Sequence, residues 1–453
     1  MAESIAFKVH QVCSISPPQG TAPISLPFTF HDALWLRFPP VERLFFYPFP
    51  NSTNPSFFFD SILPNLKHSL SLTLQHFLPL AATITWPLHL PYPLITYTPN
   101  DTVSFTIAES TANFNRLCSN LCEAEQRQHL IPQLSISHEQ ASLLALQVTL
   151  FPKFGFCIGI TTHHAALDGK SSTLFMKAWA HLCSHLGDSQ LLLPQHLTPS
   201  FDRSVIKDPS GIGEAYLNSW LNFGGETNNR SLKVWESINT PQSDLVKGVF
   251  ELTTLDIQKL KKHAQSKANN QRVLRLSTFS VTCAYLVACA VKVDKPKAER
   301  VAFVFTVDCR SRLDPPILQT YFGNCVVPQL VVAKTEEILG NDGFVKGVEG
   351  ISDLLCGLES GVLNGAENWM QKIESAMGDR LYSIAGSPRF EVYGIDFGWG
   401  RPKKVDITSI DKTGAFSLAE SRDNNGGIEI GLALTKDKME AFTTLFNHGL
   451  QSL

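Results

Sequence analysis

The stretch His163–Gly169 reads HHAALDG and lies between segments of different hydrophobic periodicity. Upstream, Leu143–Phe151 and Phe154–Thr161 are rich in β-branched and aromatic residues and are predicted as two strands joined by Pro152-Lys153. Downstream, Lys170–Leu186 has the periodicity of a helix. The stretch is therefore predicted to be a strand-to-helix loop, a position in which rigid elements orient functional side chains.

The residue types in this loop suit acid–base chemistry. An imidazole near its ordinary pKa is a suitable general base toward a hydroxyl group, which makes His164 the candidate base. Gly169 after Asp168 would let the backbone turn sharply. The spacing His-x-x-x-Asp is not specific by itself in a chain with 14 histidines. A buried histidine pair satisfied by hydrogen bonds is the structural alternative.

Helical and strand patterns alternate along the rest of the chain, which predicts an α/β fold. A chain of 453 residues corresponds to two or three domains of roughly 100–200 residues. The weakly periodic stretch Leu192–Gly225 is rich in Pro, Ser, Gly and Asn and is predicted as an interdomain crossover. We expect two mixed-sheet domains over residues 1–195 and 226–453, joined by a crossover loop over residues 196–225.

Several further elements have clear patterns. In the predicted helix Phe57–Phe77, four apolar residues share one face. Thr435 is predicted as the N-cap of the last helix, and Gly449 is predicted to lie just past its end. The other predicted helices are Leu255–Ala264, Thr278–Val291, Phe344–Leu358 and Lys436–His448. The predicted strands are Gly248–Leu252, Val301–Val307, and the hairpin pair Ala415–Glu420 and Ile428–Leu434.

Composition restricts the function classes. Hydrophobic residues make up 43% and charged residues 17%, which supports a large core, and the net charge of -3 gives no field that attracts nucleic acid. The 10 cysteines contain no C-x-x-C pair and no zinc-ligand spacing, so we expect reduced thiols and no metal site. The apolar run Leu276–Val291 is too short to cross a membrane and is predicted as a buried helix. We expect a cytoplasmic monomer that binds no membrane.

A second motif, Asp396–Gly400, reads DFGWG and precedes Arg401-Pro402. Glycines permit backbone turns that other residues resist, and Trp399 offers both an N–H donor and a broad apolar surface. The first three residues resemble the kinase motif DFG. No H-R-D loop or G-x-G-x-x-G loop accompanies them, so the kinase interpretation is rejected.

Together, HHAALDG and DFGWG resemble the motif pair of the plant BAHD acyltransferases, in order and spacing, and the resemblance covers essentially the whole chain. It implies two chloramphenicol-acetyltransferase-like domains with a solvent channel at their interface. It also implies an acyl transfer from coenzyme A to a hydroxyl group, with His164 as general base and no acyl-enzyme. Trp399 would then donate to the oxyanion of the intermediate. Asp396, Gly398 and Gly400 would support the site or, for Asp396, take part in catalysis.

Asp168 has two possible roles. A catalytic triad would have it orient His164. The family resemblance implies instead that Asp168 points away and pairs with an arginine, for which Arg310 is the candidate. We favour the structural role, because a buried carboxylate needs a partner.

Three shorter matches resemble one subgroup, the flavonoid and phenolic-glucoside malonyltransferases. They are Tyr321–Cys325 (YFGNC), Arg203–Pro209 and Asp308–Arg310. The resemblance implies malonyl-CoA as co-substrate and the sugar 6-hydroxyl of a flavonoid or isoflavone glucoside as acceptor. A malonyl carboxylate needs a cation, for which Lys170 is the first candidate and Arg310 the second.

A cationic cluster precedes Ser277-Thr278 and could meet the phosphates of CoA. The resemblance places Ser277 and Thr278 near the pantetheine arm and makes Lys261 and Lys262 candidate CoA contacts. A solvated helix face is the alternative interpretation of the cluster. Its members are Lys259, Lys261, Lys262, His263, Lys267, Arg272 and Arg275.

Other functions remain open from the sequence. The pattern H-H-x-x-x-D-G also occurs in peptide-synthetase condensation domains, although DFGWG and the free-standing length disfavour that interpretation. A catalytically inactive, ligand-binding relative is a second alternative, which the intact His164 disfavours. Within the enzyme interpretation, an aromatic or other aliphatic acyl donor is the alternative to malonyl-CoA.

Overall fold

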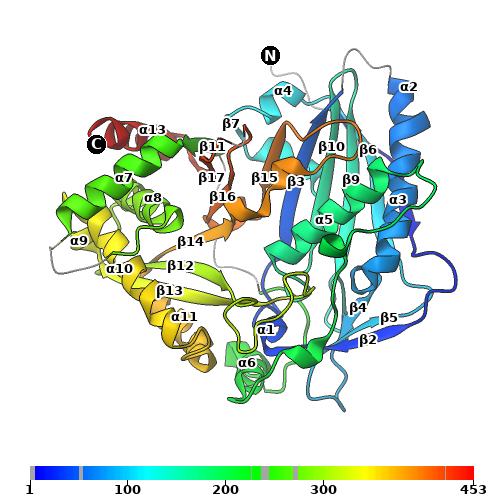
Figure 1. The fold of residues 1–453 in the computed structure, drawn as a ribbon, viewed down its shortest axis with the longest axis horizontal. Coiled ribbons are helices and arrows are strands. Elements are labelled where there is room, and N and C mark those ends of the chain that lie inside the picture. Colours follow the sequence, from blue (N-terminus) through cyan, green and yellow to red (C-terminus); the bar gives the residue numbers. More distant parts are fainter. Residues whose placement is uncertain (1–5, 50–54, 226, 236–243, 269–273, 424) are drawn as a thin grey trace.

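A computed structural model describes residues 6–49, 55–225, 227–235, 244–268, 274–423 and 425–453. Figure 1 shows two halves side by side, each with its own sheet and helices. Two large clusters of buried apolar residues form the cores of these halves. All ten cysteines are free thiols.

The sheet of the N-terminal half is mixed. Its central strands are buried along their whole length, as expected of apolar strands covered on both faces. They pair antiparallel, which confirms the hairpin predicted upstream of HHAALDG. In spatial order the six strands are β1 (Phe7–Ile15), β6 (Val103–Ser110), β9 (Leu144–Phe151), β10 (Gly155–Thr162), β3 (Val41–Pro48) and β15 (Lys404–Ile407).

The sheet of the C-terminal half is mixed as well. In spatial order its seven strands are β13 (Val326–Lys334), β12 (Arg300–Asp308), β14 (Arg380–Gly386), β16 (Phe416–Glu420), β17 (Ile428–Thr435), β11 (Leu245–Leu252) and β7 (Leu121–Glu123). β16 and β17 form the predicted antiparallel pair, although Asn424 in the predicted turn lies outside the described residues. A smaller sheet contains β2 (Ile24–Pro27), β5 (Leu94–Tyr97), β4 (Thr83–Thr85) and β8 (Gln140–Ser142).

The two large sheets exchange strands. β15 comes from the C-terminal half of the chain but pairs with β3, and β7 comes from the N-terminal half but pairs with β11. The two sheets therefore do not divide the chain at a single point. The domain limits 1–195 and 226–453 remain predictions.

Helices cover the sheet of the N-terminal half. The predicted helix Phe57–Phe77 is present, interrupted by a π-helical turn at Phe58–Ile62. Its apolar face, Ile62, Leu66, Leu70 and Leu74, is fully buried. The helices of this half are α1 (Phe30–Ala33), α2 (Pro55–Phe57), α3 (Leu63–His76), α4 (Phe114–Leu117), α5 (Gly169–Ser184) and α6 (Ile212–Leu221).

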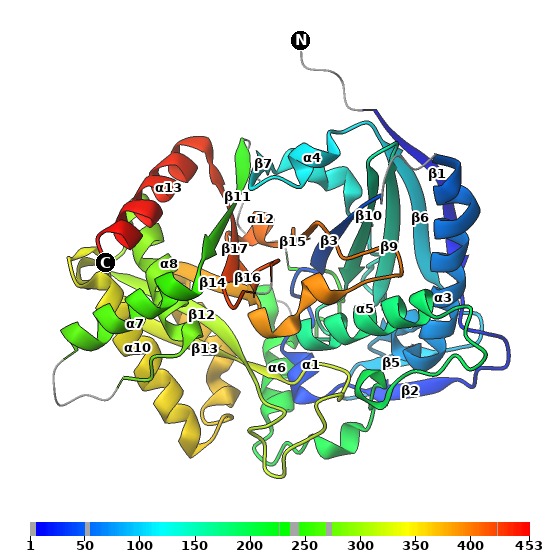
Figure 2. The same cartoon turned by 45° about the horizontal axis from the view of Figure 1, so that its top comes forward.

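Figure 2 shows α7 (Thr254–Lys267), α8 (Thr278–Asp294), α10 (Gly343–Gly357) and α13 (Lys436–Gln451) together on one side of the sheet of the C-terminal half. Every residue from Ser280 to Val291 is buried, which explains the long uncharged run. Within the described residues, no helix has both the length and the apolarity needed to cross a membrane. The helices are α7 (Thr254–Lys267), α8 (Thr278–Asp294), α9 (Thr335–Leu339), α10 (Gly343–Gly357), α11 (Trp369–Ser375), α12 (Ile410–Thr413) and α13 (Lys436–Gln451).

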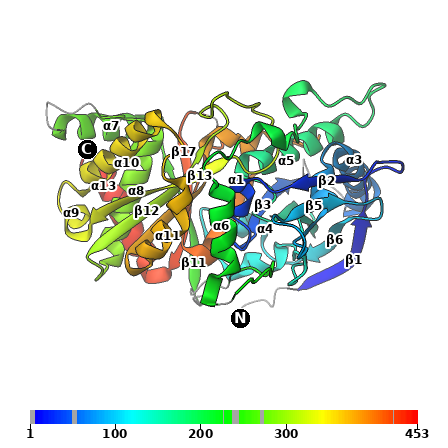
Figure 3. The same ribbon diagram turned by 90° about the horizontal axis from the view of Figure 1, so that it is seen from below.

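Two predictions about elements were wrong. The crossover is not a loop throughout, because it contains α6, which lies where the halves meet (Figure 3). Trp220 Nε1 donates to Ala33 O at 3.0 Å and Tyr216 Oη donates to Ala366 O at 2.7 Å, so α6 ties both halves together.

The last helix also does not stop at Gly449. α13 runs on to Gln451, with Thr435 as the predicted N-cap. A Cβ at Gly449 would lie 2.4 Å from Tyr285 Oη. This glycine therefore serves the close packing of α13 on α8 and does not end the helix.

Candidate active site

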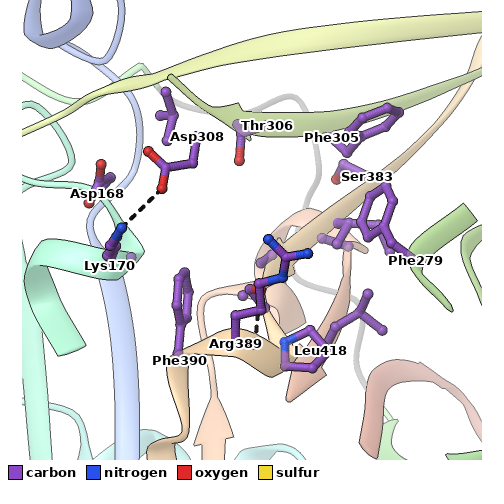
Figure 4. Close-up of a pocket in the computed structure, with 18 of the residues that line it drawn as sticks. Asp168, Lys170, Phe279, Phe305, Thr306, Asp308, Ser383, Arg389, Phe390 and Leu418 are labelled. Carbon is purple, nitrogen blue, oxygen red and sulfur yellow. Dashed lines mark hydrogen bonds and ion pairs between the residues drawn. The ribbon is translucent and has the colours of Figure 1, made fainter. Parts of the chain in front are cut away.

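A cavity of about 1930 Å³ opens where the two halves meet. Its lining includes His164 and Lys170 from the N-terminal half, and Ser277, Asp308 and Arg389 from the C-terminal half. Figure 4 shows several of these side chains around the open space. Pockets for one small ligand typically have about 300–1,000 Å³, so this cavity has room for two substrates at once.

His164 lies on the loop between β10 and α5, half-buried at the wall of the cavity. Trp35 stacks on its imidazole, with ring centroids 4.1 Å apart and 10° between the planes. Its Nδ1 is buried against the backbone of His164 itself, which leaves Nε2 as the nitrogen available to a ligand. Burial lowers the pKa of His164 to about 4, so the ring is a neutral proton acceptor at neutral pH.

The neighbouring His163 has a structural environment. It is fully buried, and its Nδ1 accepts a hydrogen bond from Ala165 N at 3.2 Å. Its carbonyl accepts from Ala166 N at 3.0 Å, which closes the turn. Burial lowers the pKa of His163 to about 3. Of the two histidines, only His164 lines the cavity.

Asp168 is fully engaged without contacting His164. Its Oδ2 forms an ion pair with Arg310 Nη2 at 2.8 Å, and both side chains are buried. The same oxygen accepts from Cys325 N at 3.1 Å, and Oδ1 caps α5 by accepting from Ser171 N at 2.8 Å. The predicted Asp168–Arg310 pair is therefore confirmed, and the geometry does not support a triad.

The YFGNC segment, Tyr321–Cys325 of the other half, holds the candidate catalytic loop, His163–Asp168. Asn324 Nδ2 donates to His164 O at 2.9 Å, and Ser171 Oγ donates to Gly323 O at 2.9 Å. Sequence reasoning noticed this segment as a family signature but missed its contact with His164. It also missed Trp35, whose only signal is its place in an aromatic-rich run before β3.

Gly169 is present for close packing and not for a sharp turn. It is the first residue of α5, and its φ lies outside the left-handed region. A Cβ there would lie 2.8 Å from Phe390 Cε2 and 3.1 Å from Arg43 Nη2. The expectation about its backbone was wrong, because the constraint comes from Phe390 of the other half.

The DFGWG loop lies far from His164. Gly398 packs against Ser184, at the end of α5 opposite to Asp168. A helix of 16 residues is about 24 Å long at about 1.5 Å per residue. Trp399 lies beside Phe156, with ring centroids 6.1 Å apart, near the start of β10, whereas His164 follows the end of that strand.

The structure therefore does not support the catalytic roles expected for Trp399 and Asp396. The indole N–H cannot reach an oxyanion held at His164. Asp396 is exposed, and its Oδ1 accepts from Gly398 N at 2.8 Å and Gly400 N at 2.9 Å. Both glycines have φ of 100°, as expected of a turn that needs them. The motif forms a folded turn that anchors the chain before β15.

The comparisons with known proteins agree with this geometry. The Transferase family model matches residues 8–448. Phenolic glucoside malonyltransferase 1 of Arabidopsis thaliana is 40% identical, with 99% of this chain and 98% of the relative covered. A BAHD acyltransferase of the same plant is 41% identical, with 97% of each covered. The chain belongs to the BAHD family.

Two further comparisons show that relatives use different substrates and that the fold is shared. An agmatine coumaroyltransferase of Arabidopsis thaliana is 38% identical, with 98% of this chain and 99% of the relative covered. The structure of vinorine synthase superposes with a TM-score of 0.70 at 22% identity, with 96% of each chain covered. The predicted α/β fold with two chloramphenicol-acetyltransferase-like domains is confirmed. The protein is an acyl-CoA-dependent acyltransferase, and its relatives differ in acyl group and acceptor.

Both side chains predicted to bind the malonyl carboxylate form ion pairs with carboxylates of this BAHD enzyme. Lys170 Nζ forms an ion pair with Asp308 Oδ2 at 3.2 Å (Figure 4). It also donates to Gln319 Oε1. Arg310 is fully buried and also pairs with Asp308 Oδ1 at 3.0 Å. Arg310 is thus occupied by two carboxylates, and Lys170 would have to leave Asp308 to meet a substrate.

The residues predicted to contact CoA fall into two groups. Ser277 and Thr278 line the cavity at the start of α8, where Ser277 is the N-cap. Lys261 Nζ donates to Thr278 Oγ1 at 3.2 Å, while Lys262 is exposed on the same helix, α7.

The remainder of the cationic cluster is partly paired. Lys267 pairs with Asp342 at 3.8 Å, and Arg275 pairs with Glu359. Arg272 lies outside the described residues.

Proposed function

We propose that this BAHD enzyme transfers a malonyl group from malonyl-CoA to the sugar 6-hydroxyl of a flavonoid or isoflavone glucoside. The observation that carries the proposal is a neutral, cavity-facing His164 in a space large enough for both substrates. The similarity to a phenolic glucoside malonyltransferase, which extends over nearly the full length of both chains, supports the choice of substrates.

In the proposed mechanism, His164 Nε2 accepts the proton of the acceptor hydroxyl while the oxygen attacks the thioester carbonyl. A positioned general base contributes about 10²–10⁴ in rate. The oxyanion forms beside the protonated imidazole and stabilises its positive charge. This attraction offsets the effect of burial, which by itself disfavours protonation of His164. Collapse breaks the C–S bond, and the CoA thiolate takes the proton back. No acyl-enzyme forms in this sequence.

The support around His164 fits this role. Trp35 fixes the plane of the ring and Asn324 fixes the backbone of the loop. Asp168 and Arg310 hold α5 and the YFGNC segment together, so their role is to position the loop and not to transfer protons.

For CoA, we propose that the pantetheine arm passes Ser277 and Thr278. The phosphates would then lie toward Lys261 and Lys262 on α7. The contact between Lys261 and Thr278 supports this path, because it places a cation at the edge of the cavity.

An aromatic acyl donor is the alternative, supported by the similarity to agmatine coumaroyltransferase. Aromatic side chains near His164, including Trp35 and Phe38, could receive such an acyl group. A catalytically inactive relative is a weaker alternative, because nothing in the described site blocks His164.

The test is mass spectrometry of products from malonyl-CoA, acetyl-CoA and coumaroyl-CoA with a set of phenolic glucosides and agmatine. We expect a mass gain of one malonyl group on a glucoside, lost in His164→Ala. Product from coumaroyl-CoA alone would favour the alternative donor. Absence of turnover with every pair would favour the inactive relative.

A further inference from the structure

The cation that meets the acyl carboxylate is not among the residues that the sequence pointed to, since Arg310 and Lys170 are paired with carboxylates of the protein. A carboxylate that leaves water on entering the cavity needs a positive partner. This inference rests on the proposed function, in which malonyl-CoA is the acyl donor.

Arg389 is such a cation. It lies in the loop Ser387–Phe390, directly after β14, and lines the cavity as an exposed side chain. Its backbone N donates to Ser387 Oγ at 3.2 Å, which fixes the turn. Figure 4 shows its guanidinium pointing into the cavity near Phe390 and Ser383. In the described part of the chain, this guanidinium has no carboxylate within ion-pair distance.

The same loop lies beside the catalytic loop. The ring of Phe390 packs on Gly169, where even a Cβ would come within 2.8 Å of it. Gly169 follows Asp168 directly and is five residues from His164. The acyl carboxylate of a malonyl thioester is only one methylene from the reacting carbonyl, so it has to lie close to the catalytic loop.

A second arginine stands behind Phe390. Arg43 is 3% exposed, and its Cζ lies 5.8 Å from the centroid of the Phe390 ring. Its Nη1 donates to Thr173 Oγ1 at 3.0 Å, whereas its Nε is buried with no partner in the residues described. No carboxylate of the described chain lies within ion-pair distance of it. Burial lowers the pKa of Arg43 to about 10, although the carboxylate of Asp168, beyond ion-pair distance, partly offsets this, and an anion bound nearby would offset the cost of burial further.

We infer that Ser387–Phe390 forms the subsite for the free carboxylate of the acyl group, with Arg389 as its direct contact. Arg43 adds positive potential from behind Phe390. The phosphates of CoA are the competing anion, but their proposed place is toward Lys261 and Lys262 on α7, beyond the pantetheine arm at Ser277 and Thr278. A charge-assisted contact of about 1.5–3 kcal/mol corresponds to about 10- to 150-fold discrimination.

The experiment compares kcat/KM for malonyl-CoA and acetyl-CoA with one saturating glucoside. The variants are Arg389→Met, Arg389→Lys and Lys170→Met, with Arg422→Met as a matched control. Arg422 is also an exposed arginine at the cavity wall, on the segment after β16. The acceptor KM and the inhibition constant of free CoA are measured for each variant.

We expect Arg389→Met to lower the malonyl-to-acetyl ratio by about 10- to 150-fold. Arg389→Lys should retain part of the ratio, and the ratio should not change in Arg422→Met or Lys170→Met. An unchanged ratio in Arg389→Met overturns the inference. Equal losses with both donors and weaker CoA inhibition assign Arg389 to the phosphates, and a raised acceptor KM alone assigns it to the acceptor.

The wild-type enzyme separates this inference from the proposed function. If wild type does not use malonyl-CoA, the proposed function fails and the acyl-carboxylate subsite fails with it. If wild type prefers malonyl-CoA and Arg389→Met keeps that preference, only the subsite is wrong.

Discussion

Asp168→Asn tests whether the aspartate of HHAALDG stabilises the loop or takes part in catalysis. The Asp168–Arg310 pair is 2.8 Å long, with 3% and 0% exposure of the two side chains. Removing one partner of a buried pair costs about 3–5 kcal/mol. Arg310 would keep its ion pair with Asp308 Oδ1 at 3.0 Å. We therefore expect the loss of unfolding free energy to lie toward the lower end of that range.

The new amide adds a second effect. Its oxygen can keep the helix cap to Ser171, but its NH₂ group would then face both Arg310 and Cys325 N, which are donors. We therefore expect a loss of about 3 kcal/mol in the free energy of unfolding. The protein that remains folded should keep kcat within about tenfold of wild type, which corresponds to about 1.4 kcal/mol in the barrier.

The assay is urea unfolding followed by tryptophan fluorescence, with kcat measured on the same preparations. Asp308→Asn is the control, because Asp308 contacts the same arginine but has a side chain 37% exposed. Its loss should stay below about 1 kcal/mol. If Asp168→Asn unfolds like wild type while kcat falls about 10⁴-fold, the size expected for a triad carboxylate, the structural role is refuted.

Three other predictions concern the base and the distant motif. His164→Ala should lower kcat at least about 10²-fold without unfolding the protein, with a milder loss in His163→Ala, and equal small losses would refute the base. Because a lowered pKa keeps the imidazole of His164 neutral in more acidic solution, kcat/KM should stay level down to about pH 5 and fall near pH 4, whereas a midpoint near 6.5 would contradict the burial. Trp399→Phe removes the indole N–H but keeps an aromatic ring, so kcat should stay within about threefold of wild type. A loss in kcat of about 10²-fold or more would instead support Trp399 as the oxyanion donor.

Local periodicity was sufficient to predict the frame of the site. β9 and β10 are mostly apolar and are buried over all eight residues of each strand, and α8 is uncharged and buried from Ser280 to Val291, so each pattern predicts a buried element. The loop between β10 and α5 follows from those elements. The Asp168–Arg310 pair came from the family resemblance, since spacing says nothing about which of many arginines lies opposite.

The errors have a common physical origin, because contacts between distant segments leave no periodic signal. Trp399 looked catalytic since its motif accompanies His164 in the family, but the packing of Gly398 on Ser184 puts it at the other end of α5. Lys170 looked free because the sequence does not show Asp308 beside it. Gly169 was expected to allow a sharp backbone turn, but what excludes a larger residue at this position is the close approach of the Phe390 ring.

The distribution of charge suggests how base strength and donor choice are kept separate. The charges that hold the catalytic loop, Asp168 and Arg310, form an ion pair behind it, and the carboxylate of Asp168 raises the pKa of His164 against the larger effect of burial. His164 itself is held by uncharged contacts, through Trp35 and Asn324. Arg389, in contrast, lies on a loop of the other half and forms no ion pair with a carboxylate of the residues that the structure describes. A change at Arg389 should therefore alter which acyl group is accepted while the pH at which His164 loses its activity stays the same, and both properties can be measured on one variant.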